Sequence, residues 1–405
     1  MFMYSHADVV RGSPAFDPLS GPASREGPSA PVSARLDRRA GAAVDRRPAP
    51  GVRLRVGVIG ASGYVGGELI RLLGRHPHVD LAGLQARGRE GTALADIHAH
   101  LTPLDLTVDA ALGDGPLDAV FAALPHGTGA DALPGIARDG TTVIDLGPDF
   151  RLRDPADYPQ WYGFVHPAPE LLAIAVYGLP ELHRDALTAL ADSPVAIVGA
   201  PGCYPTTTLL ALAPLARAGL IADLVVDAKS GISGAGREAR AASMFGEVNE
   251  SVRAYGLGGH RHVAEIEQEL AAVGAAAGMA PEANPGAVNV DFLPHLVPMT
   301  RGIHATCHVR TTRPVNQDEL DALYDHAYRD EPFVTVVGEA PATKHVLGSN
   351  HALVHVRHDP RSGRVIAIGV TDNLVKGAAG QAIQAFNVVH GLPETAGLEQ
   401  LPLFP

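Results

Sequence analysis

The chain has 405 residues, 46% of them hydrophobic and 19% charged, a composition typical of a globular protein with room for two domains. Its formal net charge of −12, uninterrupted by any long basic block, argues against nucleic acid or an anionic membrane as a partner. Two cysteines exclude a disulfide framework, and no apolar run reaches the roughly 18 to 20 residues that span a bilayer, so we expect a cytoplasmic protein.

Residues 1–51 are dominated by Pro, Ala, Ser, Gly and Arg and follow neither a helical nor a strand period. We therefore expect a disordered tail. The segment lacks the apolar stretch of a secretory signal, and its acidic residues argue against an Arg-rich transit peptide. An upstream start codon chosen in error is the alternative explanation of this segment.

A glycine turn follows the first predicted strand, residues 52–59, and opens a predicted helix at residues 64–73. The turn reads G-x-x-G-x-x-G, whereas the commoner dinucleotide motif is G-x-G-x-x-G. Both patterns let the backbone approach a pyrophosphate closely at a helix N-terminus. The predicted dinucleotide site comprises Gly60, Ala61, Ser62, Gly63, Tyr64, Val65 and Gly66. The alternative is a tight turn that binds no cofactor.

The second predicted strand, residues 79–84, should end near the adenosine ribose of a bound dinucleotide. NAD-selective sites carry an acidic residue there, but this chain has Arg87 and Arg89 instead. The arginines favour a 2′-phosphate, so we predict NADP(H) as the cofactor. Two solvated loop arginines without a ligand are the alternative.

Further apolar strands are predicted at residues 117–124 and 142–147, alternating with helical stretches. This alternation indicates a parallel, doubly wound, Rossmann-type nucleotide domain. Pro125 begins a Pro-His-Gly turn at the carboxyl end of a strand, where ligands bind in such sheets, so we include it among the cofactor contacts. Residues 150–195 are expected to be rich in loops.

Cys203 lies between an apolar strand-like run, residues 195–198, and a Leu/Ala-rich helix. A Pro-Gly break precedes the cysteine, which places it at the helix N-terminus. The unpaired N–H groups and the macrodipole there favour a thiolate, and the same N–H groups can hold an oxyanion when the thiolate attacks a carbonyl. We predict that Cys203 is a nucleophile ionised at neutral pH. A free cysteine buried in a domain seam is the alternative.

Two polar segments of the second half could serve the same chemistry. Ser230, Ser233 and Arg237 lie within eight residues, among glycines that follow a predicted strand, and indicate an anion cradle rather than a flexible surface loop. His260 and His262 stand at the start of a predicted helix, where a histidine is a candidate acid/base partner for Cys203.

Beyond residue 288 the chain reads mainly as strands, which predicts an α+β domain with a mixed, largely antiparallel sheet. Cys307 alternates within one such strand, so we regard it as structural. A helix rich in small residues is expected over 371–387, where Gly and Ala permit close packing on another backbone or a ligand. The predicted strands are residues 289–299, 302–310, 333–337, 352–357 and 364–370.

Nine motifs in order carry a resemblance to a known family. They lie at residues 60–66, 124–127, 145–152, 177–181, 201–206, 230–237, 259–262, 294–302 and 372–382. With these motifs the chain resembles the N-acetyl-gamma-glutamyl-phosphate reductases of the arginine pathway, in the superfamily of aspartate-semialdehyde dehydrogenase. The resemblance covers roughly residues 53–400 and leaves only the tail outside.

The resemblance implies roles for particular residues. It places the nucleophile on Cys203 and the acid/base on His260, although His262 stays open because the preceding glycine run varies in length among relatives. It adds Asn373 to the NADP contacts. In the mechanism that these residues suggest, Tyr255 is a candidate to orient the histidine. Ser230, Ser233 and Arg237 would hold the substrate phosphate. No metal is expected.

The resemblance also implies a domain plan and a reaction. Residues 52–207 and 371–405 would form a discontinuous nucleotide domain, and residues 208–370 a catalytic and dimerisation domain of a homodimer or homotetramer. The implied reaction is the NADPH-dependent reduction of N-acetyl-L-glutamyl 5-phosphate to the 5-semialdehyde through a cysteine thioester. Aspartyl or amino-adipyl phosphate is the alternative substrate, and a non-catalytic NADP-sensing regulator is the alternative class.

Overall fold

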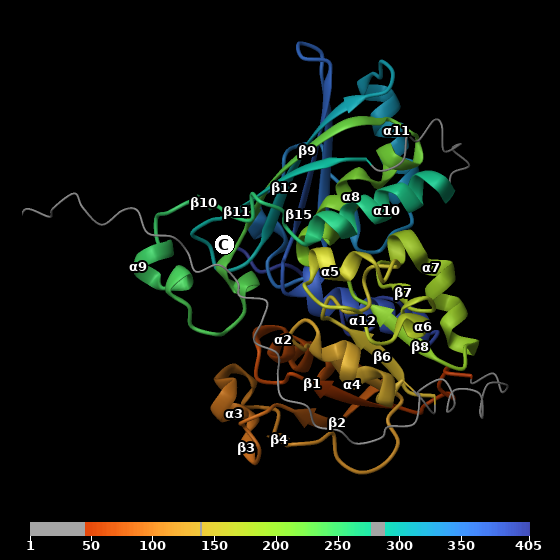
Figure 1. Cartoon of the computed structure of the whole chain (residues 1–405), viewed down its shortest axis with the longest axis vertical. Helices are drawn as coiled ribbons and strands as arrows, with labels where there is room; N and C mark the ends of the chain where they lie inside the picture. The colour runs from red at the N-terminus through yellow and green to blue at the C-terminus, as the bar shows by residue number, and fades with distance from the viewer. Residues whose placement is uncertain (1–44, 138–139, 277–287) are drawn as a thin grey trace, which may run out of the picture. The chain divides into compact units, whose positions relative to one another are not determined.

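A six-stranded parallel sheet organises the first part of the computed structural model, which describes residues 45–137, 140–276 and 288–405 (Figure 1). Its strands are β1 (Leu54–Ile59), β2 (Val79–Gln85), β5 (Ala119–Ala122), β6 (Thr142–Asp145), β7 (Val176–Tyr177) and β8 (Ala196–Gly199). The strand order is β2-β1-β5-β6-β8-β7, and every pairing is parallel. This order confirms the predicted Rossmann-type nucleotide sheet.

Helices cover both faces of this sheet, which is why its strands are continuously apolar. The helices associated with it are α2 (Tyr64–Leu73), α4 (Thr128–Ile136), α5 (Asp157–Trp161), α6 (Pro169–Leu172), α7 (Pro180–Ala189) and α12 (Gly380–Val389). Phe121 of β5 belongs to the core under α2 and α12, whereas its neighbour Val120 packs with α4 and α5 on the other face. The C-terminal helix α12 therefore packs on the same face of this sheet as α2; the discontinuous nucleotide domain that the resemblance implied stays a prediction.

The second sheet has seven strands in the order β10-β11-β9-β12-β15-β14-β13. Its strands are β9 (Ile221–Ser230), β10 (Arg253–Ala254), β11 (Val290–Leu296), β12 (Ile303–Thr311), β13 (Val334–Val336), β14 (Ala352–Asp359) and β15 (Arg364–Thr371). The β9/β11 and β13/β14 pairs are parallel and the other pairs are antiparallel. The predicted mixed, largely antiparallel sheet is thus confirmed.

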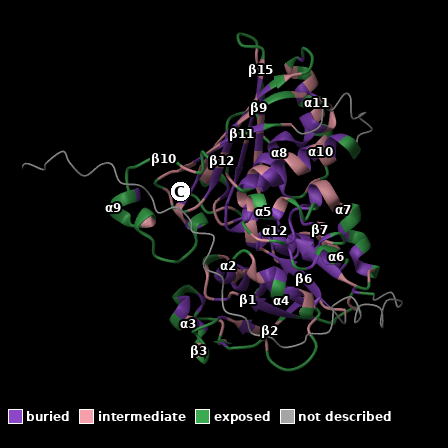
Figure 2. Ribbon diagram, in the orientation of Figure 1, coloured by how far each residue is buried: buried purple, intermediate pink, exposed green. Residues whose placement is uncertain are grey.

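One face of the second sheet packs on helices α8 (Cys203–Arg217), α10 (His262–Ala276) and α11 (Gln317–Tyr328). Residues 204–216 of α8 are all buried, and the helix is drawn as buried along nearly its whole length (Figure 2). Alternate residues on the opposite face, such as Val225, His304 and Ile366, are only half-buried. Cys203 is the first residue of α8, so the packing of α8 on the second sheet fixes the position of Cys203.

Shorter elements connect these layers. They are β3 (Thr92–Ala93), β4 (Thr107–Val108), α3 (Leu94–Ile97), α9 (Phe245–Val248), the 3₁₀ turns η1 (Ala99–Leu101), η2 (Leu190–Asp192), η3 (Ile232–Ala235), η4 (Ala241–Ser243) and η5 (Thr343–Val346), and the π-helix η6 (Val375–Ala379). Within the described residues, no helix is both long enough and apolar enough to cross a membrane.

The structure corrects two expectations about local order. The tail was predicted to extend to residue 51, but Arg46 is buried because its guanidinium donates to the Leu190 carbonyl, 3.1 Å away, and to the Ser193 carbonyl. Residues 1–44 lie outside the described residues. The region 150–195, expected to be rich in loops, contains α5, α6, α7 and the edge strand β7.

The predicted domain boundary between residues 207 and 208 falls inside α8, which runs without interruption from Cys203 to Arg217. The Thr207 hydroxyl lies 2.6 Å from that of Thr371, at the end of β15. The first turn of α8 is thereby joined to the second sheet. As a division into separate folding units, the predicted boundary stays a prediction.

Candidate active site

A cavity of about 350 Å³ lies where the carboxyl ends of β5 and β6 meet the first turn of α8. In doubly wound sheets this end of the strands is the usual place for a ligand. The lining includes ten of the predicted site residues: Gly60, Gly63, Tyr64, Val65, Gly66, Pro125, Cys203, Ser233, Arg237 and Asn373. The structure therefore brings the predicted cofactor turn and the predicted nucleophile to one cavity.

The glycine turn has the geometry that a pyrophosphate requires. Gly60 has φ +82°, and a Cβ added there would lie 2.2 Å from the Ala123 carbonyl oxygen. A Cβ on Gly66 would lie 2.2 Å from the Gly60 carbonyl oxygen, so only glycine permits this close packing. Helix α2 begins after Gly63 with no side-chain cap and no acidic residue in its first turn. Its first N–H groups are thus available to a phosphate, and the turn fits a dinucleotide.

Cys203 is the first residue of α8, and Gly202 is its N-cap, as the sequence predicts. The expected ionisation at neutral pH is wrong for the ligand-free protein, because burial raises the pKa of the Cys203 thiol to about 11. Arg151 and the N–H groups of Cys203 and Tyr204 act in the opposite direction but do not outweigh burial. The burial comes partly from the π-helix, since a Cβ on Gly377 would lie 2.8 Å from that of Cys203.

A buried ion pair fixes the turn that presents Cys203. Arg151 donates from Nη1 to Glu265 Oε1 at 3.1 Å and from Nε to the Ala200 carbonyl at 2.7 Å. Glu265 Oε2 accepts from the Gly202 N–H at 3.0 Å and from the Tyr177 hydroxyl at 3.1 Å. Arg151 binds the carbonyl before Pro201, and Glu265 binds the N–H after it. The ion pair therefore sets the direction in which the backbone enters α8.

Sequence reasoning missed Arg151 and Glu265, although both lie in segments singled out for other reasons. One signal was the Asp-Phe-Arg run at residues 149–151, shortly after β6 and so at the ligand end of the sheet. A second was the position of Glu265, three residues after His262 and so on the same face of α10. Neither signal shows that the two side chains meet across 114 residues of sequence.

The two histidines occupy different places. His262 lines the cavity and is buried, and its Nε2 lies 2.5 Å from where a Cβ on Gly202 would be. His260 lies behind it, with ring centroids 4.7 Å apart, and packs on Tyr204 and Tyr255. Burial lowers the pKa of His260 to about 4 and, with the nearby positive groups, holds that of His262 well below its ordinary value. Both imidazoles are neutral at pH 7 and can accept a proton.

The predicted anion cradle forms a loop after β9, residues 230–237, here termed the anion loop. Ser233 accepts a hydrogen bond from the Asn373 side-chain amide at 2.9 Å and lines the cavity. Ser230 is buried and donates to the Gly231 carbonyl. Arg237 donates to the Ser62 carbonyl at 3.2 Å and the Ile97 carbonyl at 2.8 Å, so its guanidinium joins the anion loop to the cofactor turn.

The remaining predicted residues lie outside the cavity lining. Ala61 is buried, with its carbonyl 2.8 Å from His98 Nε2, and Ser62 faces Arg237 as described. Arg87 and Arg89 are exposed in the loop after β2. Within the described ranges, no group of three or more His, Cys, Asp or Glu side chains has an arrangement that could hold a metal ion.

Comparison with known proteins gives the family. A model of the semialdehyde dehydrogenase NAD-binding domain matches residues 55–190, and one of the semialdehyde dehydrogenase dimerisation domain matches residues 203–373. An N-acetyl-gamma-glutamyl-phosphate reductase of Halorhodospira halophila is 48% identical over 360 residues, which cover 87% of this chain and 100% of the relative.

Solved structures share the fold at lower identity. Aspartate semialdehyde dehydrogenase II of Vibrio cholerae, complexed with ASA, gives a TM-score of 0.62 at 19% identity, covering 83% of this chain and 98% of that one. The Candida albicans aspartate semialdehyde dehydrogenase with NADP gives 0.61 at 17% identity, covering 85% and 99%. The sequence identity, the two domain models and the fold agree that the chain belongs to the N-acetyl-gamma-glutamyl-phosphate reductase family, an oxidoreductase family of the semialdehyde dehydrogenase type.

Proposed function

We propose that this chain reduces N-acetyl-L-glutamyl 5-phosphate to N-acetyl-L-glutamate 5-semialdehyde and phosphate, with NADPH as reductant and Cys203 as covalent nucleophile. The observation that carries the proposal is that Cys203, His262 and the glycine turn line one cavity. The family's curated relative from Halorhodospira halophila bears the name of this reaction and is matched over its whole length. A cysteine and an imidazole beside a dinucleotide turn are the parts that reductive acyl transfer requires.

The cofactor would be held by residues that the structure already arranges for it. The N–H groups at the start of α2 face the position of a pyrophosphate, and Pro125 and Asn373 line the adjoining part of the cavity. Arg87 and Arg89 are free in the loop after β2 to meet a 2′-phosphate, which supports NADP(H) over NAD. When bound, NADPH supplies the hydride.

The acyl transfer begins from a neutral thiol, because burial keeps Cys203 protonated. An imidazole of the His260 and His262 pair accepts the thiol proton as sulfur attacks the acyl carbon. The C–S bond forms, the bond from that carbon to the phosphate oxygen breaks, and the departing phosphate takes up a proton from solvent. A thioester on Cys203 remains, and the N–H groups at the start of α8 stabilise the oxyanion of each tetrahedral intermediate.

Hydride addition to the thioester carbonyl leaves the oxyanion of a hemithioacetal on Cys203. Its C–S bond breaks to release the aldehyde, and the imidazolium returns its proton to the cysteine sulfur. Arg151 and Glu265 touch the turn before Cys203 on both sides and act by holding the sulfur in place. Ser233 lines the cavity close to this turn and is a candidate phosphate contact together with Ser230 and Arg237.

The choice between the two histidines is open to a direct test. The family resemblance favours His260, whereas the position against Gly202 favours His262. Replacing each in turn with asparagine and measuring kcat across pH would identify the acid/base. The variant that lacks the acid/base should have a kcat about 10²- to 10⁴-fold lower than the wild-type protein, the usual contribution of a general acid/base. The other variant should keep a wild-type pH profile.

The proposed reaction is best tested in reverse, as phosphate-dependent reduction of NADP⁺ by N-acetyl-L-glutamate 5-semialdehyde. Aspartate semialdehyde in a parallel assay serves as the competing substrate, because the fold is shared with enzymes named for it. Turnover that requires phosphate and prefers the N-acetylated substrate is expected. Faster turnover of aspartate semialdehyde would overturn the substrate assignment, and Cys203→Ser with undiminished turnover would overturn the covalent step.

We also propose that the chain forms a homodimer. Residues 203–373 match the dimerisation domain of the family, and one face of the seven-stranded sheet within this range is only half-buried. Light scattering on the purified chain should give twice the 42.1 kDa mass of one copy or a multiple of it. A monomeric mass at micromolar concentration would contradict the proposal.

A further inference from the structure

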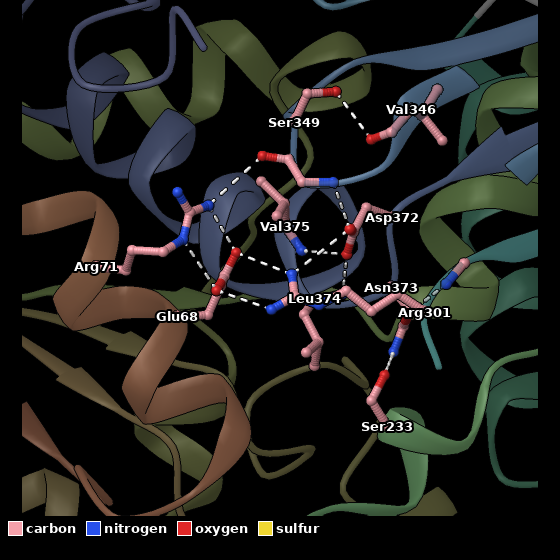
Figure 3. Close-up of polar contacts among 12 residues, drawn as sticks. Glu68, Arg71, Ser233, Arg301, Val346, Ser349, Asp372, Asn373, Leu374 and Val375 are labelled. Atoms are coloured by element: carbon pink, nitrogen blue, oxygen red, sulfur yellow. Dashed lines mark hydrogen bonds and ion pairs between the residues drawn. The ribbon is translucent and has the colours of Figure 1, made fainter. Parts of the chain in front are cut away.

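Glu68, in the second turn of α2, carries a buried carboxylate held by two arginines (Figure 3). Arg301, from the loop between β11 and β12, donates from Nη1 and Nη2 to the two carboxylate oxygens at 3.1 Å each. Arg71, from the next turn of α2, donates to the same oxygens at 2.8 and 3.1 Å. The Arg301 contact joins α2 to a loop of the second sheet, whereas the Arg71 contact lies within α2.

Arg301 has a second acidic partner across the same junction. Its Nη1 lies 3.5 Å from Oδ2 of Asp372, which is fully buried at the end of β15 (Figure 3). Asp372 Oδ1 accepts from the N–H groups of Leu374 and Val375, at 2.8 and 3.2 Å, and so fixes the start of the π-helix that covers Cys203. The guanidinium therefore links the helix of the cofactor turn to the element that packs on the nucleophile.

The backbone around Arg301 holds the anion loop. The Gly231 N–H donates to the Gly302 carbonyl at 2.9 Å, and the Ser233 N–H donates to the Thr300 carbonyl at 3.1 Å. The Gly302 N–H donates to Asn373 Oδ1 at 2.7 Å, and the amide of Asn373 reaches Ser233. A displacement of Arg301 would therefore move the anion loop relative to α2.

We propose that Arg301 is a positioning residue: it joins α2 to the anion loop and the π-helix, and so fixes the cofactor turn relative to Cys203. The inference rests on the proposed function, in which hydride must reach a carbonyl carbon attached to that sulfur. Arg301 does not line the cavity, so it acts through its neighbours. Since a misplacement of about 1 Å far from the chemistry can cost about 100-fold in rate, a link of this kind matters for kcat.

Arg71 provides a matched control. It makes the same pair of bonds to Glu68, but its partner lies on its own helix, and beyond that helix it approaches the Gly348 carbonyl at 3.5 Å. When one of the two arginines is replaced, the other still pairs with Glu68. Neither Arg301→Gln nor Arg71→Gln therefore leaves the buried carboxylate unpaired. Asp372 likewise keeps its three backbone donors. Both variants should fold.

The test compares the two variants with the wild-type protein by kinetics and by hydrogen exchange. Arg301→Gln should lower kcat by roughly 30- to 100-fold, while both KM values and the NADPH dissociation constant from fluorescence titration change by no more than about 3-fold. Its deuterium isotope effect, measured with NADPH labelled at the transferred hydrogen, should rise. Amide exchange should become faster in residues 231–237 and 374–379. Arg301→Lys should recover part of the rate, and Arg71→Gln should retain wild-type kcat and exchange.

Equal losses of kcat in Arg301→Gln and Arg71→Gln would overturn the proposal, because both would then act only through the charge on Glu68. Unchanged kcat and unchanged exchange in Arg301→Gln, with only a lower melting temperature, would overturn it as well. Exchange and NADPH binding need no substrate. A wild-type protein that fails to turn over the semialdehyde would therefore overturn the proposed function. Hydrogen exchange in the two variants would still show whether Arg301 holds the anion loop and the π-helix in place.

Discussion

Burial decides the protonation state of Cys203. A helix N-terminus contributes about 0.3–1 kcal/mol to an exposed negative charge, less than the roughly 1.4 kcal/mol that corresponds to one pKa unit. The π-helix packs on the Cβ of Cys203, and desolvation of the thiol raises its pKa to about 11. The resting state therefore has a neutral thiol and neutral imidazoles. The thiol loses its proton only when it attacks the substrate.

Alkylation of Cys203 should follow this protonation state. In the ligand-free protein, labelling by iodoacetamide should be slow at pH 7 and rise about tenfold per pH unit toward pH 11, since the thiolate is the nucleophile. Mass spectrometry of the Cys203 peptide measures the rate, and Cys307, buried within β12, is an internal reference that should stay unlabelled. A labelling rate that levels off below pH 8 would show that the thiol is ionised in the resting enzyme.

The ion pair of Arg151 and Glu265 should matter for stability as well as for activity. Glu265→Gln removes the ion-pair partner of the buried guanidinium, and breaking a buried pair in this way costs about 3–5 kcal/mol. Urea unfolding should show this loss, together with a lower kcat because the Gly202 N–H loses its anionic acceptor. Glu267→Gln is the control on the same helix, since its carboxylate accepts only from a backbone N–H among the contacts described. Equal stability of the two variants would contradict the assigned role.

At the scale of elements, the glycine turn and α2 form one unit in which backbone packs on backbone. Gly66→Ala should weaken NADPH binding by at least about tenfold and destabilise the fold, because the new Cβ would meet a carbonyl oxygen at 2.2 Å. Gly135→Ala, in α4, meets nothing within 4 Å and should stabilise the protein by up to about 1 kcal/mol. Fluorescence titration and thermal unfolding of both variants provide the measurements. Unimpaired NADPH binding in Gly66→Ala would place the cofactor elsewhere.

Elements built from local patterns could be predicted from the sequence. Strand β1, the glycine turn and α2 follow from hydrophobic period and turn chemistry within twenty residues, and Cys203 at the start of α8 follows from the Pro-Gly break. The edge strand β7 could not be predicted, because two residues carry no period and its partner β8 lies about twenty residues further along.

The parts of the site that depend on distant contacts were also out of reach. The acid that holds the Gly202 N–H lies 63 residues away, and Gly377, which packs on the Cβ of Cys203, lies in another segment again. The spacing of residues along the chain does not predict which of these distant residues meet in the fold. The error over the thiol pKa has this origin, since the local sequence contains the helix N-terminus but not the packing that outweighs it.

At the scale of the whole molecule, the segment before β1 takes part in the fold. The Arg46 N–H donates to the Ala191 carbonyl at 3.1 Å, and His390 Nδ1 lies 2.8 Å from the Arg46 carbonyl. A chain that begins at residue 52 should therefore be less stable than one that begins at residue 45 by about 2–6 kcal/mol, the sum of the four lost hydrogen bonds of Arg46. Equal melting temperatures would show that Arg46 contributes nothing to stability.

The cavity draws its parts from the whole chain: the cofactor turn from the first sheet, Cys203 and His262 from helices on the second sheet, and Asn373 from the segment that returns to the first. The reaction therefore depends on both sheets keeping their places. The Arg301 contacts with Glu68 and Asp372 are one means by which the fold achieves this.

In the proposed reaction, an acyl group passes through the sulfur of Cys203. Mixing the enzyme with NADP⁺ and N-acetyl-L-glutamate 5-semialdehyde, without phosphate, should give a rapid burst of one NADPH per active site and an acylated Cys203 peptide. Steady turnover should begin only when phosphate is added. If the enzyme turns over with phosphate but shows neither a burst nor an acylated Cys203 when phosphate is absent, the reaction does not pass through a thioester on Cys203.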